Sequence, residues 1–316
     1  MKFFSETFRE LSGFSDIKNC IEKKISPVCA TGLSSVHKAQ FIYSLYSGKP
    51  FLVVCENEAQ AKKLSDDITL MANDSDFVSF FPSRELALTK IEGYSREYEH
   101  QRISALSKLA KGSCKIVCAS IEAVMQPVIS RSFLVDNTIL IKTGKEIILE
   151  NLKKQLVDMG YARCDKVEGP SQFSIRGAIA DIFPVQSANP VRIEFWGDDV
   201  DSIFYFDVES QRRTDSIDEI EIAPAIETVT DREILAEKIE ALGKKLRSKK
   251  ADIRRDNFAR DCELLREGAE LLYIDKYIPL IYDKKPSVFE YFDNFTIFSE
   301  FSSAIEHTKG VMAQYN

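Results

Sequence analysis

Phe51-Leu52-Val53-Val54-Cys55 is a continuous apolar run in a chain of 316 residues. A strand of a parallel sheet is buried on both faces, so it is apolar throughout instead of alternating. Helical spacing follows directly, because apolar residues recur every three or four positions, at Ala61, Leu64, Ile68 and Met71. A strand followed by an amphipathic helix is the repeating unit of a parallel α/β sheet.

The same pattern extends over the first part of the chain. Further apolar runs predict strands at residues 27–30, 77–81 and 115–119. Ser120 stands where it can cap a short helix that ends before Pro127. We therefore expect residues 1–130 to form an α/β domain with a parallel sheet.

After about residue 130 the pattern changes to closely spaced strands with turn residues between them. Apolar and polar side chains alternate over residues 191–196, and Gly197-Asp198-Asp199 turns the chain into a second strand. This alternation is typical of an antiparallel sheet with one exposed face. We predict a small, mainly antiparallel α+β domain at residues 131–222.

The remaining segment, residues 223–316, is predicted to be largely helical. It is dense in charge from Asp231 to Arg266 and includes a strand-like run at residues 295–298. If that late strand returns to the first sheet, the small domain interrupts the α/β domain.

The composition excludes several classes of protein. The 44% of hydrophobic and 29% of charged residues are ordinary globular values. No apolar run reaches the roughly 18 residues that span a bilayer, and residues 1–6 do not resemble a signal peptide, so we expect a cytoplasmic protein without membrane contact. The seven cysteines are predicted to be free thiols, and neither they nor the three histidines fit a metal-binding or catalytic motif.

The turn that precedes the first predicted helix is where a phosphate-binding loop would lie. The motif G-x-x-x-x-G-K-[ST], laid over residues 29–36, requires two glycines, a lysine and a hydroxyl residue. At those places the chain has Cys29, Ser34, Ser35 and Val36, with Gly32 as the one glycine between them. Without the lysine the phosphates lose a cation, and without the last hydroxyl Mg²⁺ loses a ligand. We predict a degenerate loop, no nucleotide hydrolysis and no cofactor for this chain.

Two arginines of the small domain, Arg163 and Arg176, are the candidate binding residues. Alternation along residues 173–184 predicts that Phe173 faces the core, while Arg163, Ser174 and Arg176 share the outer face. Arginines on a rigid sheet can grip carboxylates in bidentate fashion, and arginine is enriched at interface hot spots. From the pattern alone, the alternative that they pair with acidic residues of the same sheet stays open.

Charge is unevenly distributed along the small domain. Residues 131–185 hold 8 basic and 7 acidic side chains, whereas residues 186–222 hold 3 and 10. A strongly acidic part beside a basic contact suits protein recognition better than DNA wrapping. The basic run at residues 244–255 is interspersed with acidic residues, which favours a solvated helix face over a phosphate-binding surface.

At these residues the sequence resembles a known family. Gly160-Tyr161-Ala162-Arg163 and the block from Arg176 to Pro184 are similar to the small domain shared by the excision-repair helicase subunit UvrB and the bacterial transcription-repair coupling factors. Phe206-Asp207-Val208-Glu209-Ser210-Gln211-Arg212 resembles a turn of the coupling factors, and Phe81-Pro82 and Met125-Gln126-Pro127 also fit them. The resemblance covers essentially the whole chain.

The resemblance implies a degenerate, non-hydrolysing helicase-type domain that is interrupted by a small domain binding UvrA. It places Arg163 and Arg176 at the positions of UvrA-contacting arginines, with Ser174 where UvrB has a third arginine and Phe173 beside it. It also implies a bacterial cytoplasmic protein of which this chain is an N-terminal piece. RNA polymerase, DNA, ATP and Mg²⁺ would bind regions that this chain lacks, and the C-terminal region of the whole protein would mask the small domain.

The function expected is therefore that of a non-catalytic module that recruits UvrA and couples the removal of stalled RNA polymerase to nucleotide excision repair. Two alternatives stay open at this point. One is a nucleotide-dependent UvrB-like helicase fragment with an unusual loop. The other is a DNA-binding module that uses the basic run at residues 244–255.

Overall fold

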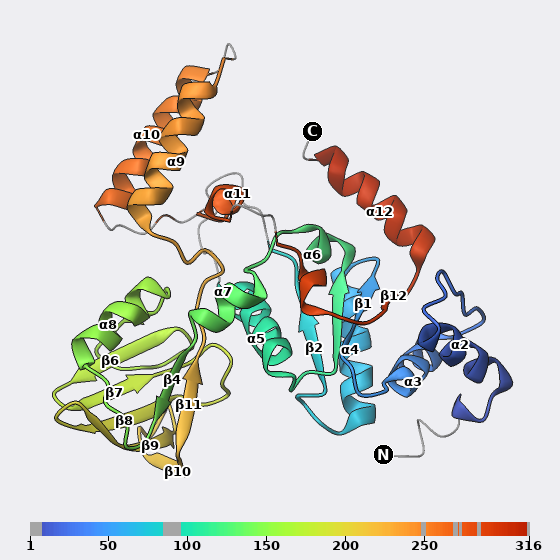
Figure 1. The fold of residues 1–316 in the computed structure, drawn as a ribbon, viewed down its shortest axis with the longest axis horizontal. Coiled ribbons are helices and arrows are strands. Elements are labelled where there is room, and N and C mark those ends of the chain that lie inside the picture. The colour runs from blue at the N-terminus through green and yellow to red at the C-terminus, as the bar shows by residue number, and fades with distance from the viewer. Residues whose placement is uncertain are drawn as a thin grey trace. The chain divides into compact units, whose positions relative to one another are not determined.

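The computed structural model describes residues 8–84, 96–247, 251–267, 271, 274–282 and 286–314. The chain divides into two compact units, each with strands of its own (Figure 1). The first unit comprises residues 1–84, 104–126 and 287–316, and the second comprises residues 85–103 and 127–286.

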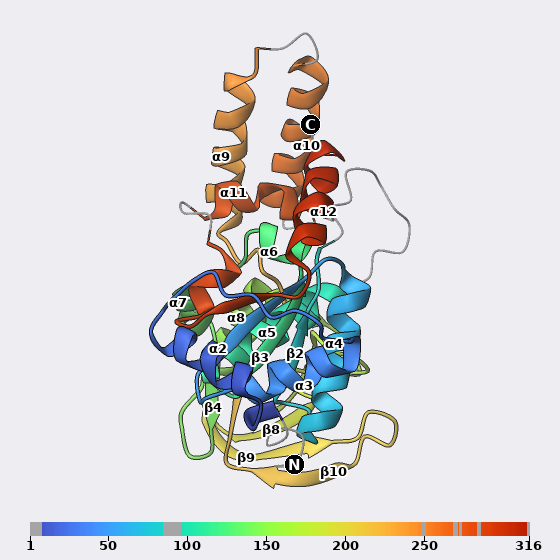
Figure 2. The same cartoon turned by 90° about the vertical axis from the view of Figure 1, so that its right-hand side faces the viewer.

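A four-stranded parallel sheet, in the order β12–β1–β3–β2, forms the centre of the first unit (Figures 1 and 2). Its strands are β1 (Phe51–Cys55), β2 (Val78–Phe81), β3 (Ile116–Ser120) and β12 (Thr296–Phe298). β1 and β3 are buried at every position, as strands covered on both faces must be. The predicted parallel α/β sheet is confirmed.

The late strand β12 returns to this sheet and pairs in parallel with β1, with Val53 opposite Ile297. Next to the pair, the rings of Phe51 and Phe295 stack with centroids 4.7 Å apart. The edge of the first sheet is therefore built from a segment that follows all strands of the second unit in the sequence.

Some helices of the first unit begin at a side-chain cap and others do not. The helices of this unit are α2 (Ser12–Glu22), α3 (Ser35–Leu45), α4 (Glu58–Ala72), α6 (Ile121–Met125), α12 (Phe301–Gln314) and the 3₁₀ turn η2 (Val288–Tyr291), while α5 (Glu97–Lys111) has residues in both units. As expected, Ser120 caps α6, because its Oγ accepts a hydrogen bond from the Ala123 N–H at 3.1 Å. Asn57 caps α4 in the same way, through the Gln60 N–H at 2.9 Å.

The strand predicted at residues 27–30 is wrong. Residues 25–34 contain no helix or strand, and the side chain of Val28 is exposed. Pro27 cannot donate a hydrogen bond to a ladder, and Cys29 and Ala30 offer little apolar surface to bury. Four residues with one β-branched side chain cannot hold a place in a sheet by burial alone.

The second unit is built on a six-stranded sheet, in the order β10–β9–β8–β7–β6–β5. Its strands are β5 (Ala162–Arg163), β6 (Gln172–Arg176), β7 (Ile179–Ile182), β8 (Val191–Trp196), β9 (Asp199–Phe206) and β10 (Arg213–Ile217). All neighbours are antiparallel except β5 and β6, which run parallel. The predicted antiparallel sheet is confirmed, and β4 (Ile139–Lys142) and β11 (Glu219–Ile222) add a separate antiparallel pair.

Helices complete the second unit. They are α7 (Arg131–Asp136), α8 (Leu149–Asp158), α9 (Arg232–Lys245), α10 (Ala251–Arg266), the 3₁₀ turn η1 (Ile274–Tyr277) and α11 (Ile278–Ile281). α9 and α10 run side by side in both views (Figures 1 and 2) and bury a small apolar cluster that includes Leu235, Ile239 and Leu265. α8 covers one face of the six-stranded sheet, since Leu152 and Leu156 share a core with Phe173.

Gly160 ends α8 and turns the chain into β5. Its φ is +87°, a conformation that favours glycine, and two hydrogen bonds close the helix end. The Gly160 N–H donates to Val157 O at 3.0 Å, and the Tyr161 N–H donates to Leu156 O at 2.9 Å. Tyr161 is then buried, with its hydroxyl donating to Ala223 O at 2.8 Å. The glycine–tyrosine pair of the motif thus positions Arg163.

Replacing Gly160 with alanine is expected to lower the free energy of unfolding by about 2 kcal/mol. The positive φ costs about 1–2 kcal/mol for a side chain, and a Cβ would lie 2.7 Å from a methyl carbon of Ile226, which must move. Urea denaturation of the two proteins measures the difference. Gly144 also has a positive φ but open space around it, so Gly144→Ala should cost less. Equal losses for the two variants would show that the contact with Ile226 is immaterial.

A buried ionisable cluster lies in the second unit. Arg102 and Glu227 are both fully buried, and Arg102 Nε donates to Glu227 Oε1 at 2.5 Å. Glu99 Oε1 accepts from the Glu227 N–H at 3.0 Å. Burial, with the nearby charges of Asp275 and Glu227, raises the pKa of Glu99 from its ordinary 4.5 to about 7.

The raised pKa of Glu99 predicts a pH dependence of stability. Between about pH 4.5 and 7 the folded state binds a proton at Glu99 that the unfolded state has released, so stability falls as the pH rises through this range. Glu99→Gln keeps the acceptor oxygen without the charge, and it should stabilise the protein by about 1–2 kcal/mol at pH 8. Thermal unfolding at pH 5 and pH 8 measures this, with Glu97→Gln on the same helix as the exposed control. A Glu99→Gln effect of equal size at both pH values would contradict the assignment.

Candidate partner-binding surface

The six-stranded sheet has two faces of different character. Phe173, Ala180 and Ile193 point into the core under α8. The face that carries Asp181, which we call the outer face, is opposite, because Ser174 pairs with Asp181 and Asp181 pairs with Arg192 across β6, β7 and β8.

A carboxylate organises the outer face. Asp181 is only 1% exposed, and it accepts hydrogen bonds from two arginines. Arg176 Nη2 lies 2.8 Å from Asp181 Oδ2, and Arg192 binds both oxygens, with Nε at 2.7 Å and Nη2 at 2.9 Å. The open alternative from the sequence, pairing of an arginine within its own sheet, is therefore realised for Arg176.

Arg192 holds this carboxylate in place. Its guanidinium lies over the ring of Phe206, 4.8 Å from the ring centroid, and donates to Gln211 O at 3.3 Å. The hydrogen bond to Asp181 raises the pKa of Arg192 above its ordinary value, so the guanidinium stays charged. Sequence reasoning missed Arg192 and Asp181. The sequence signal that could have found them is that each is a charged residue within a strand in which apolar and polar residues alternate.

Arg176 is held at one end and exposed at the other. Its side chain is 56% exposed, although Nη2 is bonded to Asp181. Nη1 lies 3.5 Å from Asp165 O, which further restricts the side chain. The guanidinium is therefore presented at the surface in a restricted geometry, with N–H groups left to bind an incoming carboxylate.

Arg163 lies on the other side of the sheet edge, contrary to the expectation that it shares the outer face. β5 runs parallel to β6 and pairs Arg163 with Phe173, and paired residues point to the same face. Its neighbours agree: Tyr161 belongs to the core under α8, and Cys164 packs beside Phe183 and Phe206. Arg163 is exposed and has no ion-pair partner within the described part of the chain.

Phe173 and Ser174 are not accessible to a partner. Phe173 is fully buried in the core, in agreement with its predicted orientation. Ser174 points to the outer face but is buried there, because its Oγ donates to Asp165 O at 3.1 Å and the chain around Asp165 covers it. Only Arg163 and Arg176 of the four predicted residues therefore present a side chain at the surface.

The degenerate loop lies at the start of α3. Cys29 is exposed, Gly32 has a φ of +81°, and Ser34 precedes the helix with its Oγ 3.0 Å from His37 Nδ1. Val36 is exposed. Ser34 thus bonds a side chain and does not cap the helix N–H groups.

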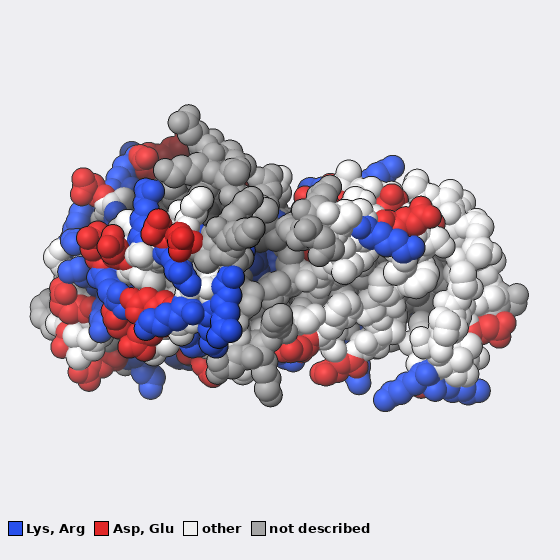
Figure 3. Space-filling model, turned by 90° about the horizontal axis from the view of Figure 1, so that it is seen from above, with Lys and Arg blue, Asp and Glu red and all other residues white. Residues whose placement is uncertain are grey.

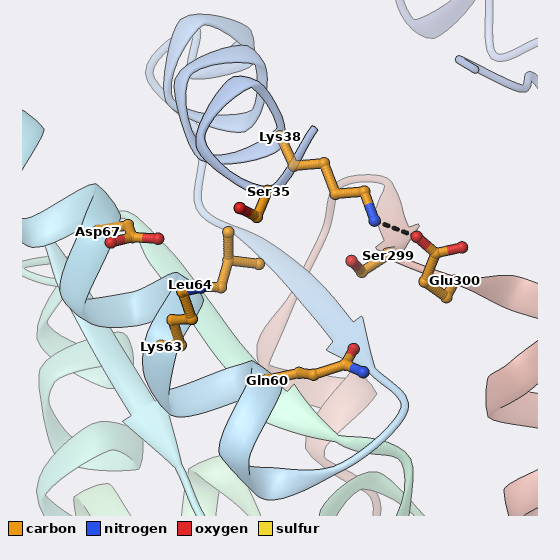
Figure 4. A pocket seen from close by; sticks show the side chains of 8 residues that line it. All are labelled: Ser35, Lys38, Gln60, Lys63, Leu64, Asp67, Ser299 and Glu300. Atoms are coloured by element: carbon orange, nitrogen blue, oxygen red, sulfur yellow. Dashed lines mark hydrogen bonds and ion pairs between the residues drawn. The ribbon is translucent and has the colours of Figure 1, made fainter. Parts of the chain in front are cut away.

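A pocket of about 260 Å³ lies beside this loop, and Figure 4 shows its walls. It is lined by Ser35 and Lys38 of α3, by Gln60, Lys63, Leu64 and Asp67 of α4, and by Ser299 and Glu300. The ammonium group of Lys38 pairs with Glu300 (Figure 4). The carboxylate of Glu300 would repel a phosphate bound here. Lys38 is already paired with Glu300, so it does not replace the lysine that is missing from the phosphate-loop motif.

Over the residues that the structure describes, no three His, Cys, Asp or Glu side chains are placed to hold a metal ion. All seven cysteines are free, as predicted. Burial raises the pKa of the Cys55 thiol to about 11, so it stays protonated and unreactive at neutral pH. None of the described helices is long and apolar enough to cross a membrane.

The basic run at residues 244–255 is partly used inside the α9–α10 hairpin. Arg255 donates to Gly243 O at 3.3 Å and to Leu246 O at 2.7 Å, so it binds the carbonyls at the end of α9. In Figure 3, basic and acidic side chains are interspersed over this hairpin. Lys249 and Lys250 lie outside the described residues. The arrangement favours the solvated helix face over a phosphate-binding surface.

The second unit contains a domain of a known class. Residues 139–227 match the family of UvrB interaction domains. This segment runs from β4 to β11 and holds both exposed arginines together with the Asp181 network. The six-stranded sheet with its outer face lies within the segment that matches this family.

The chain as a whole is similar to transcription-repair-coupling factors. It is 33% identical to that of Bacillus subtilis over 297 residues, which is 90% of this chain and 25% of the relative. It is 30% identical to that of Haemophilus influenzae over 247 residues, which is 78% of this chain and 21% of the relative. The chain thus spans about a quarter of the length of these relatives, and the resemblance to the transcription-repair coupling factors is confirmed.

Proposed function

We propose that this chain is the N-terminal, non-catalytic module of a transcription-repair coupling factor, and that it recruits UvrA through the domain at residues 131–222. By this contact it links removal of stalled RNA polymerase to nucleotide excision repair. RNA polymerase and DNA, together with ATP and Mg²⁺, bind other regions of the whole protein. The first unit, at residues 1–84, 104–126 and 287–316, serves as the scaffold, a helicase-type domain without a working phosphate loop.

The observation that carries the proposal is the pair of exposed arginines in a UvrB interaction domain. Arg176 is already oriented by Asp181, so little side-chain entropy is lost when a partner carboxylate binds it. Arg163 has no internal partner among the residues described, and its whole guanidinium is available. The two arginines leave the sheet from opposite faces of its β5–β6 edge, which suits a partner that wraps around this edge.

Replacing either arginine with alanine is expected to weaken UvrA binding by about 2 kcal/mol, or roughly thirtyfold. Isothermal titration calorimetry of the chain with UvrA measures the affinity. Arg212→Ala is the matched control, because Arg212 is exposed in the β9–β10 turn at the other end of the sheet. If the double variant of Arg163 and Arg176 binds UvrA as tightly as the unchanged chain, the proposal is wrong.

A further inference from the structure

Among the residues that the structure describes, Trp196 has the most exposed large apolar side chain, at 83%. It is also the only tryptophan of the chain. It ends β8 and precedes the tight turn at Gly197, which has a φ of +64°. Burial of a tryptophan contributes much to folding, so an exposed one is not explained by the stability of the domain.

Trp196 lies on the outer face at the same end of the sheet as Arg176. Phe195 is in the core, so Trp196 points to the opposite face, as Glu194 does. Arg176 pairs with Ile179, and Ile179 pairs with Glu194, two residues before Trp196. The β6–β7 and β8–β9 turns follow these positions, so both side chains belong to one end of the sheet.

The turn beside Trp196 is acidic. Asp198 and Asp199 are exposed, and Glu146 is bridged to Asp199 along the backbone. None of these three carboxylates has an ion-pair partner among the described residues. An aromatic face next to unpaired carboxylates attracts a cation twice, through the ring quadrupole and through charge.

We propose that Trp196 and the turn carboxylates Asp198 and Asp199 form a second contact for UvrA, which receives an arginine or lysine side chain of that protein over the indole ring. The inference rests on the proposed function and extends its surface from Arg176 across the turn end of the sheet. The complete surface is then of mixed charge, with arginines that bind acidic residues and an aromatic–acidic turn that binds a basic one. Such a surface selects a partner by the arrangement of its charges as well as by the area buried on binding.

A substitution series at Trp196 separates the contributions of the ring. Trp196→Ala should weaken UvrA binding roughly thirtyfold, and Trp196→Leu roughly tenfold, because leucine restores apolar area without the π face. Trp196→Phe should stay within about threefold of the unchanged chain. Leu140→Ala, at an exposed apolar residue of β4, is the matched control and should bind normally. The side chain is exposed, so the variants should fold with unchanged stability.

Fluorine NMR gives a direct readout. A chain labelled with fluorotryptophan has one resonance, because Trp196 is its only tryptophan. Unlabelled UvrA should shift that resonance, and Asp198→Asn combined with Asp199→Asn should reduce the affinity and its dependence on salt. If the arginine variants lose UvrA but Trp196→Ala binds normally with an unshifted resonance, this inference is wrong and the proposed function stands. If the unchanged chain does not bind UvrA at all, the proposed function fails and the inference with it.

Discussion

Arg102→Met is expected to lower the free energy of unfolding by about 3–5 kcal/mol. The substitution removes the Arg102 guanidinium from the fully buried carboxylate of Glu227, and breaking one side of a buried ion pair is costly because the remaining charge is desolvated. Methionine fills much of the volume of the arginine stem, so little of the loss comes from a cavity. Urea denaturation followed by circular dichroism measures it.

The control for Arg102 is a solvent-exposed arginine that also pairs with glutamates. Arg266 pairs with Glu233 and Glu240 on the exposed surface of α9 and α10, and Arg266→Met should leave the unfolding midpoint almost unchanged. A second check combines Arg102→Met with Glu227→Gln, which removes the buried negative charge and should recover part of the lost free energy of unfolding. An Arg102→Met protein that unfolds at the same urea concentration as the unchanged chain would mean that the pair is not closed in solution.

Local patterns in the sequence were enough to predict the strands that burial dictates. The unbroken apolar run at Phe51–Cys55 is explained by a strand that is buried on both faces. The alternation at residues 191–196 is explained by a strand that is buried on one face. The cap at Ser120 was also predictable, because it needs only a residue and the N–H groups that follow it. The strand prediction at residues 27–30 was wrong because the apolar content of that segment is too small to determine its structure.

Long-range pairing was beyond the reach of such patterns. Arg102 and Glu227 come together from segments 125 residues apart, and no local signal joins them. Alternation fixes which residues share a face within a strand, but not how one strand is aligned with the next, and it therefore predicts the wrong face for Arg163. The parallel pairing of β5 with β6 sets that alignment and moves Arg163 to the other face. The exposure of Trp196 depends on the packing of everything around it, so a local sequence pattern does not predict it.

Asp181→Ala is expected to affect both the stability of the domain and its binding of UvrA. The substitution leaves Arg192 mostly buried and without its carboxylate, which should lower the free energy of unfolding by about 2–4 kcal/mol. Arg192 keeps the Phe206 ring and Gln211 O, and part of its side chain reaches water, so the loss is smaller than for Arg102. Asp181→Ala combined with Arg192→Met should be more stable than Asp181→Ala alone.

The effect of Asp181 on UvrA binding acts through Arg176, and a double-mutant cycle tests this. Asp181→Ala frees Arg176 to adopt other rotamers, so affinity for UvrA should fall by about 1 kcal/mol, or roughly fivefold, at temperatures where the variant is folded. In a chain that already carries Arg176→Ala, the same change should cost nothing further, because the oriented guanidinium is gone. Equal losses in the two backgrounds would show that Asp181 supports UvrA binding through the fold of the sheet and not by orienting Arg176.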